Sequence, residues 1–320
     1  MQSKSLPACA ALSLALAVLI AGASLSAPAL TSHKEMMTRL ASLELADGSV
    51  GQGRMTLVSV GRSVQGREIP MVVLASPGVA LADTRRMFVM CRQHGDEPAT
   101  TEAMLKLITD LVTSPSDEDA DLLDRVSFFI VPMVNPDGAE RKQRRNAEGV
   151  DLNRDWVALA QPETRAVRAA IDLVAPEVIV DAHELSPTNR GSDYLQCAGP
   201  SSGASAEVVE ESVRIQSLMV GMLQTHGIEV TSYHIDNLRG TELAHRHFPT
   251  CANTKTFLFE TRQAGARSGY IEYRMHLHIV GAMTIAKYLA GRESQLAQRI
   301  ADWKLENQRM LASRGKRRPR

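Results

Sequence analysis

The ten residues CRQHGDEPAT, numbers 91–100, join the end of one structural element to the start of the next. The apolar run 87–91 has the length and composition of a short buried strand. Pro98 is well placed as the first residue of a helix, because proline lacks the N–H that a helix leaves unpaired there. The turn between them carries His94 and Glu97. We therefore expect these two polar side chains at the carboxyl end of a strand, where open α/β sheets build their sites.

The rest of the chain continues the alternation of apolar strands and amphipathic helices. We expect a strand, a turn and a strand over 55–74, buried strands over 87–91, 126–131, 178–180 and 256–259, and helices over 33–45, from 98 onward, over 163–174, over a long segment ending near 227, and over 271–289. Such an order predicts one α/β domain with a mainly parallel or mixed central sheet and helices on both faces.

Two charged stretches fall outside this alternation. The acidic patch DEDAD at 117–121 is expected to be a solvated loop, since it lacks the spaced oxygen ligands and the glycine of an EF-hand. The closing RGKRRPR at 314–320 is expected to be a disordered basic tail. We therefore assign 28–295 to the folded domain and 296–320 to the end of the last helix and this tail.

The 320-residue chain balances 36 basic against 36 acidic side chains, and 44% of its residues are apolar. A chain of this length can bury a large core. Because its formal charges cancel, no net field draws it to nucleic acid or to an anionic membrane surface. We expect a monomer that binds no nucleic acid, and its partners must be inferred from individual sites.

Residues 1–27 have the pattern of a secretory signal peptide. A lysine precedes an apolar run over 8–20 that is short for a membrane span, and small residues follow. Cleavage after Ala23 and cleavage after Ala27 both fit the pattern. We expect an exported protein, periplasmic or secreted, that does not associate with the membrane once the signal is removed.

Export would place Cys91, Cys197 and Cys251 in an oxidising compartment, where cysteines tend to pair. Cys91 lies within an apolar run and fits a small buried residue. The remaining two leave two alternatives, a disulfide between Cys197 and Cys251 or three buried thiols.

Imidazole and carboxylate are good zinc ligands, so the spacing of His94 and Glu97 predicts a metal site. On its own, H-x-x-E also fits a helix-capping glutamate beside a surface histidine. His183, in VIVDAHEL, follows another buried strand and therefore offers a third ligand at the same edge of the sheet. His245 and His247 are second-choice ligands. Three protein ligands leave one position for water, which is the arrangement of a catalytic zinc.

A catalytic zinc requires a general base that is not itself a ligand. Glu260, in TKTFLFETR, ends a further apolar strand and is the best candidate. Three strand ends would then bring two histidines and two glutamates to one edge of the sheet. Each residue alone is a weak signal, whereas their convergence is a strong one.

Longer strings carry a family likeness. The string NPDGAERKQRRNAEGVDLNRDW (135–156), together with HGDE, VDAHE and FLFETR in that order, resembles the zinc carboxypeptidases of the M14, carboxypeptidase A-like, family. SVGRSVQGREI near the start is similar to the opening signature of that family. The resemblance implies a zinc carboxypeptidase-like catalytic domain. It also implies one zinc ion held by His94, Glu97 and His183, with Glu260 as the base.

The same resemblance implies the groups that bind substrate. Asn153 and Arg154 match the pair that clamps the free C-terminal carboxylate of a peptide, for which a guanidinium fork is well suited. Arg145 matches the arginine that polarises the scissile carbonyl, and Arg144 is the alternative if the register is shifted by one. Asp151 matches a carboxylate that orients the first zinc histidine through its other ring N–H.

Two features depart from the family pattern. Glu184 and Leu185 follow the second zinc histidine, where a serine and an aromatic residue are common, and we associate this variant with a bacterial branch. Many members also close a tyrosine over the bound substrate. Its candidates here are Tyr233, Tyr270 and Tyr273, each of which also fits ordinary packing.

The sequence therefore predicts an exported zinc carboxypeptidase that hydrolyses C-terminal peptide bonds by zinc-activated water, with Glu260 as general base and Arg145 stabilising the oxyanion. Its substrate would be a peptide or a peptidoglycan stem peptide with a free C-terminal carboxylate. One alternative is another zinc amidohydrolase on the same fold, acting on peptidoglycan peptides or on N-acyl amino acids. A zinc-binding protein without catalysis is the other alternative.

Overall fold

Strand β3 (Arg85–Cys91) lies in the middle of a sheet, and its last five residues are buried as their apolar character predicts. The computed structural model describes residues 30–49, 51–189, 191–263 and 270–315. The predicted signal peptide, 1–27, lies outside the described residues. Contacts divide the chain into Met1–Leu30 and Thr31–Arg320, and all elements named here belong to the second unit.

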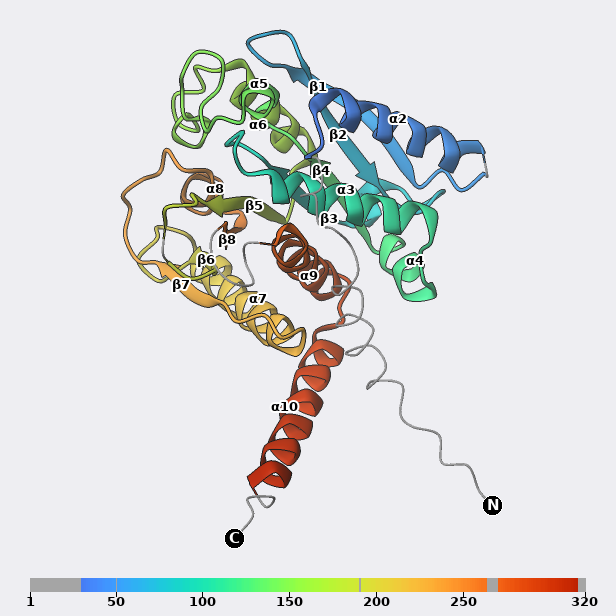
Figure 1. The fold of residues 1–320 in the computed structure, drawn as a ribbon, viewed down its shortest axis with the longest axis vertical. Helices are drawn as coiled ribbons and strands as arrows, with labels where there is room; N and C mark the ends of the chain where they lie inside the picture. Colours follow the sequence, from blue (N-terminus) through green and yellow to red (C-terminus); the bar gives the residue numbers. More distant parts are fainter. Residues whose placement is uncertain (1–29, 50, 190, 264–269, 316–320) are drawn as a thin grey trace. The chain divides into compact units, whose positions relative to one another are not determined.

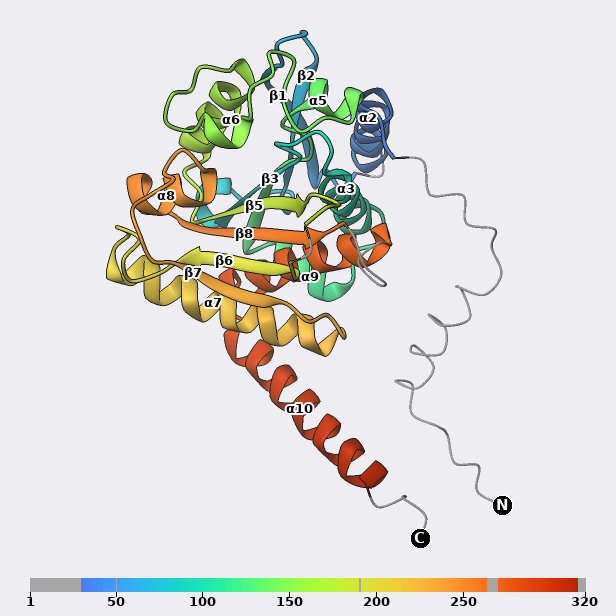
Figure 2. The ribbon, with the colours of Figure 1, turned by 60° about the vertical axis from the view of Figure 1, so that its left-hand side comes forward.

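The described residues form one eight-stranded mixed sheet (Figures 1 and 2). Strands β4, β3, β5 and β8 lie side by side and run parallel. Antiparallel pairs extend the sheet at both edges. The strand order is β1 (Met55–Arg62), β2 (Glu68–Leu74), β4 (Val126–Val131), β3, β5 (Val178–Leu185), β8 (Lys255–Arg262), β6 (Tyr194–Ala198) and β7 (Thr231–Ile235).

Alternation along β5 sends side chains into two separate cores, one on each face of the sheet. Val178, Val180 and Ala182 pack in the larger core, whereas Ile179 packs in the smaller one. The larger core includes side chains of α2 (His33–Ser49), α3 (Pro98–Thr113), α4 (Asp117–Leu123), α7 (Ala206–Thr225), α9 (Ile271–Leu289) and α10 (Glu293–Gly315). The smaller core includes those of α6 (Pro162–Val174) and α8 (Ala244–Ala252). The predicted fold class, a mixed sheet with helices on both faces, is confirmed.

Some predicted boundaries are wrong. The acidic patch is not a loop, because 117–123 form α4, which Ser116 begins with a capping box. Strands β6 and β7 have no predicted counterpart. β7 is largely exposed and so lacks the apolar run that indicates a strand. Helix α10 continues to Gly315, and residues 316–320 of the expected basic tail lie outside the described residues.

The structure distinguishes between the two alternatives for the cysteines, a Cys197–Cys251 disulfide and three buried thiols. Among the described residues, Cys91 and Cys197 are buried free thiols and Cys251 is an exposed free thiol. A disulfide between Cys197 and Cys251 is therefore absent, and the expectation of three buried thiols is wrong for Cys251. Within the described ranges, no helix combines the length and the apolar character needed to cross a membrane.

Candidate metal centre

The turn after β3 packs directly on the short helix α5 (Pro136–Arg141). A side chain at Gly95 would overlap the backbone of Gly138, so glycine is required for this close approach. Asn135 begins α5 by accepting the Gly138 N–H at 2.8 Å. Its amide nitrogen donates to the carbonyl oxygens of Gln93 and Arg144, at 3.1 and 3.3 Å. The N-P-D-G string thus holds the turn that carries His94.

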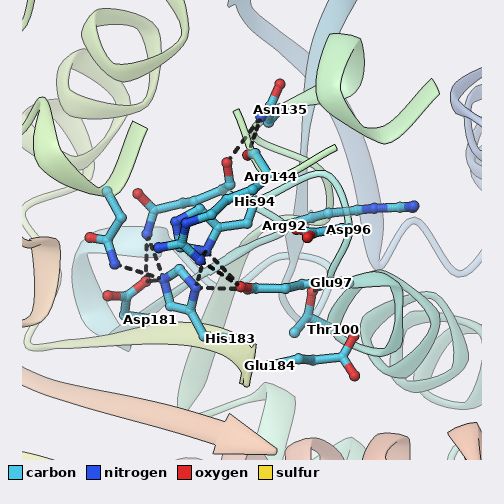
Figure 3. Close-up of polar contacts among 12 residues, drawn as sticks. Arg92, His94, Asp96, Glu97, Thr100, Asn135, Arg144, Asp181, His183 and Glu184 are labelled. Atoms are coloured by element: carbon cyan, nitrogen blue, oxygen red, sulfur yellow. Dashed lines mark hydrogen bonds and ion pairs between the residues drawn. The ribbon is translucent and has the colours of Figure 1, made fainter. Parts of the chain in front are cut away.

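His94, Glu97 and His183 meet in a buried cluster (Figure 3). Each offers one ligand atom, and these atoms all lie within 4.8 Å of one another. The Nδ1 atoms of the two histidines are 3.1 Å apart. The Glu97 carboxylate oxygens lie 2.6 Å from Nδ1 of His94 and 2.8 Å from Nδ1 of His183. In the described part of the chain, this is the one cluster of at least three such residues that could hold a metal ion.

The second nitrogen of each imidazole faces its own carboxylate. Nε2 of His94 lies 2.9 Å from Oδ1 of Asp151, and Nε2 of His183 lies 2.9 Å from Oδ1 of Asp181. A neutral ring that donates its Nε2–H to a carboxylate keeps a lone pair on Nδ1. The two lone pairs then point at the same small region as Glu97. This arrangement fits a cation held between them.

The charges around the cluster fit a divalent cation. Among the described residues that contact the imidazoles, Glu97, Asp151 and Asp181 carry three negative charges against the one positive charge of Arg144. Burial raises the pKa of Glu97, but the two histidines lower it to about 2. Burial lowers the pKa of His183, but Asp181 and Glu97 raise it well above its usual value. Imidazole and carboxylate are also the donors that zinc prefers.

The second-choice ligands do not join this cluster. His245 is buried, and its Nδ1 faces the outer oxygen of Asp181 at 3.3 Å. It therefore contacts Asp181 and is not one of the ligand cluster. Nε2 of His247 accepts a hydrogen bond from Arg168 at 2.9 Å.

Glu260 lies directly opposite His183 in the register of β5 and β8. Its side chain therefore leaves the same face of the sheet as His183. Its Oε2 is buried and, within the described chain, has no hydrogen-bond partner. Burial raises the pKa of Glu260 to about 7, although the charge of His183 opposes the rise. Tyr194 faces Glu260 from the other side in the register of β6 and β8.

The side chains of two consecutive arginines, Arg144 and Arg145, contact different partners. Arg144 reaches the cluster, with Nη1 at 3.1 Å from Nδ1 of His94 and Nε donating to Oδ2 of Asp151 at 3.1 Å. Arg145, the residue to which the family resemblance gave the carbonyl-polarising role, is exposed and donates to the Gly149 carbonyl at 2.8 Å. The structure therefore places the alternative, Arg144, beside the candidate ligands.

Asn153 and Arg154 lie in the 3-10 turn η2 (Leu152–Arg154). Asn153 is buried, and its Oδ1 accepts the Ala244 N–H at 3.0 Å while its Nδ2 lies 3.1 Å from Nε2 of His183. The guanidinium of Arg154 is exposed and donates to the Asn153 carbonyl at 2.9 Å. Of the two predicted clamp residues, Arg154 has the more accessible side chain.

Sequence reasoning missed several residues of the centre. Asp181 precedes His183 by two positions on one strand, and this spacing, which puts both on the same face, was the available signal. Gln93 donates to Oδ1 of Asp181 at 2.6 Å and accepts the Trp156 indole N–H at 2.8 Å. No periodic pattern indicates Gln93, because it lies in an irregular turn.

This chain is similar to known proteins in both sequence and fold. A family model described as zinc carboxypeptidase matches residues 51–234. This span includes His94, Glu97 and His183 and ends before Glu260. Probable carboxypeptidase 2 of Arthroderma benhamiae is 31% identical over 129 residues, which are 39% of this chain and 24% of that protein. In this match the chain spans only about a quarter of the length of its curated relatives.

Two solved structures illustrate the shared fold. A metallo-carboxypeptidase from Burkholderia cenocepacia is 22% identical, with a TM-score of 0.62 over 80% of this chain and 69% of that chain. Carboxypeptidase A from Helicoverpa armigera is 18% identical, with a TM-score of 0.66 over 88% of this chain and 81% of that chain. At these identities the likeness concerns the fold alone.

Proposed function

The chain belongs to the zinc carboxypeptidase family, whose model matches residues 51–234, and from this premise we propose that it is an exported enzyme that hydrolyses C-terminal peptide bonds. One observation carries the proposal. Nδ1 of His94, Nδ1 of His183 and the Glu97 carboxylate converge on one point, and Glu260 stands beside them without being part of the ligand cluster. Three ligands and a separate carboxylate are what metal-assisted hydrolysis requires.

His94, Glu97 and His183 would hold one zinc ion, which when bound supplies a Lewis acid that activates water and polarises the scissile carbonyl. Glu260 accepts the proton of the attacking water and passes it to the leaving amine. Its buried Oε2, which has no hydrogen-bond partner in the described chain, is open to this proton.

Arg144 is the proposed partner of the oxyanion. Its guanidinium already lies 3.1 Å from Nδ1 of His94 and remains partly exposed, so it can meet negative charge that develops beside the ligands. Arg145, whose guanidinium is turned to the Gly149 carbonyl, is the weaker candidate. Asp151 fixes both His94 and Arg144, since its two oxygens each face one of them.

Arg154 is the proposed clamp for the free carboxylate of the substrate. Its exposed guanidinium offers a planar pair of donors to a carboxylate. Asn153 lies between this arginine and His183, with its amide held by the Ala244 backbone. We assign Asn153 a part in the clamp that depends on this fixed position.

Incubation of the purified protein with three substrates tests the function. They are a peptide mixture, the same peptides with amidated C-termini, and a cell-wall stem peptide. Carboxypeptidase activity predicts stepwise loss of C-terminal residues from the free peptides, much slower loss from the amidated ones, and no reaction after treatment with a chelator. Release from the stem peptide alone would identify a peptidoglycan enzyme. Failure to cleave any of them with zinc bound would favour a non-catalytic protein.

A further inference from the structure

Helix α3 begins at the ligand Glu97, which occupies its N-cap position. The Glu97 carboxylate faces His94 and His183 and, in the described chain, makes no capping hydrogen bond to its own helix. The first N–H groups of any helix lack partners within the helix. The first turn of α3 therefore needs an acceptor from another part of the fold.

Glu184 is that acceptor. Its Oε2 accepts the Ala99 N–H at 2.7 Å, and its side chain is 0% exposed. Pro98 has no N–H, so Ala99 is the first residue of α3 that requires an acceptor. A carboxylate at the N-terminus of a helix is also favoured by the helix dipole. Glu184 thus caps α3 from strand β5.

The alternation of β5 makes this contact part of the metal centre. Successive side chains of a strand leave opposite faces, so His183 faces the ligand cluster while Glu184 faces α3. Figure 3 shows Glu184 extending below Glu97 and Thr100. The two ligands His183 and Glu97 are therefore joined twice. They meet at the centre itself, and Glu184, one residue after His183, also meets Ala99, two residues after Glu97.

Arg274 of α9 completes the arrangement. Its Nη1 pairs with Oε1 of Glu184, and its side chain is only 10% exposed. Burial raises the pKa of Glu184 to about 7, and Arg274 opposes that rise. Because a buried carboxylate without a partner is strongly destabilising, Arg274 is what allows a charged cap at this position.

We propose that Glu184 is a positioning residue of the metal centre, which holds Glu97 toward His183 by capping α3 at Ala99, with Arg274 as its supporting partner. Glu184 acts through the helix that carries Glu97 and does not touch the ion. The inference rests on the proposed zinc site, but it does not depend on which substrate the enzyme cleaves.

The test is the zinc affinity of the full chain, measured by competition with a chromogenic chelator at a temperature where every variant is folded. Glu184→Gln keeps the size of the side chain and removes the charge. Loss of residues that orient metal ligands typically weakens metal binding about 10- to 100-fold, and we expect an effect of this size. Glu184→Asp, which keeps the charge but draws it back from Ala99, should also weaken binding.

Glu163→Gln is the matched control. Glu163 is another buried glutamate, at the first turn of α6, and its Oε1 accepts the Val64 N–H at 3.1 Å. Its loss should lower stability and leave zinc affinity unchanged. Equal zinc affinity in wild type and folded Glu184→Gln would overturn the inference, as would an equal loss in Glu163→Gln. A wild type that binds zinc and cleaves no peptide would count against the proposed function alone.

A second measurement needs no variant, in case Glu184→Gln does not fold. If the cap and the metal centre are coupled, zinc binding must strengthen the hydrogen bond at Ala99, since such coupling is reciprocal. Hydrogen exchange of the Ala99 amide, followed by NMR on the full chain, should therefore be slower with zinc than without it. The same exchange rate in both states would contradict the proposal.

Discussion

His183 and Glu260 lie directly opposite each other on the adjacent parallel strands β5 and β8. The candidate ligand and the candidate base are thus separated by one inter-strand spacing, about 4.8 Å, which the hydrogen bonds of the sheet maintain. Tyr194 of β6 continues the same row on the far side of Glu260. A base held by a sheet in this way keeps its distance from the ligand without help from a mobile loop.

Glu260→Gln should abolish most of the peptidase activity while zinc remains bound. The amide has nearly the same shape but cannot take the proton of the attacking water, and loss of a general base typically lowers the rate about 10²- to 10⁴-fold. The measurements are kcat on a free peptide and the zinc content of the variant. Full activity in zinc-loaded Glu260→Gln would refute the assignment of the base.

Glu260→Gln should also make the zinc-free protein more stable than the zinc-free wild type at high pH. The pKa of Glu260 is raised from an ordinary 4.5 to about 7 in the folded state. The folded protein therefore favours the protonated form, and this contribution to stability is complete below pH 4.5 and is lost as the pH rises through about 7.

At about pH 8, Glu260→Gln should raise the free energy of unfolding by on the order of 1–3 kcal/mol, and at about pH 4 this gain should disappear. Chemical denaturation of both zinc-free proteins at the two pH values measures the difference. A gain of the same size at both pH values would mean that the charge of Glu260 is not its cause.

Arg144→Met and Arg145→Met form a matched pair of adjacent substitutions. Arg144 lies beside His94, whereas Arg145 is bound to the Gly149 carbonyl. Loss of one group that stabilises an oxyanion typically lowers kcat about 10²- to 10³-fold, and we expect this for Arg144→Met only. Both variants should be assayed at saturating zinc, because Arg144 also contacts Asp151. A larger loss in Arg145→Met would restore the assignment made from the family resemblance.

Arg154→Ala should distinguish substrates by their C-terminus. A charged hydrogen bond to a carboxylate contributes about 1.5–3 kcal/mol, so kcat/KM on free peptides should fall roughly 10- to 100-fold, mainly through KM. Hydrolysis of amidated peptides, however slow, should change little. If both kinds of substrate lost activity equally, Arg154 would not be a carboxylate clamp.

The elements that position the site could be predicted from the sequence because they are local. Each of His94, His183 and Glu260 comes within three residues after an apolar run, and such runs predict strands whose ends meet at one edge. The alternation of strands and helices predicted the fold class for the same reason. The register between β5 and β8, which sets His183 against Glu260, depends on long-range pairing and was not predictable from either segment alone.

The other residues of the site could be assigned only once the folded structure was known. Arg144 and Arg145 are adjacent in an irregular segment with no periodicity, and the contacts that fix this segment are long-range, such as the hydrogen bond from Asn135 to the Arg144 carbonyl at 3.3 Å. Glu184 departs from the family pattern in the sequence, yet its contact with Ala99 joins residues 85 positions apart. Contacts of this kind leave no local pattern in the sequence.

The central claim is that one zinc ion binds between His94, Glu97 and His183. Diffraction from zinc-loaded crystals, recorded at the zinc absorption edge, locates the ion without reference to activity. We predict a single anomalous peak about 2.0–2.2 Å from Nδ1 of each histidine and from the Glu97 carboxylate. A peak at any other site, or none here in crystals shown to contain zinc, would contradict it.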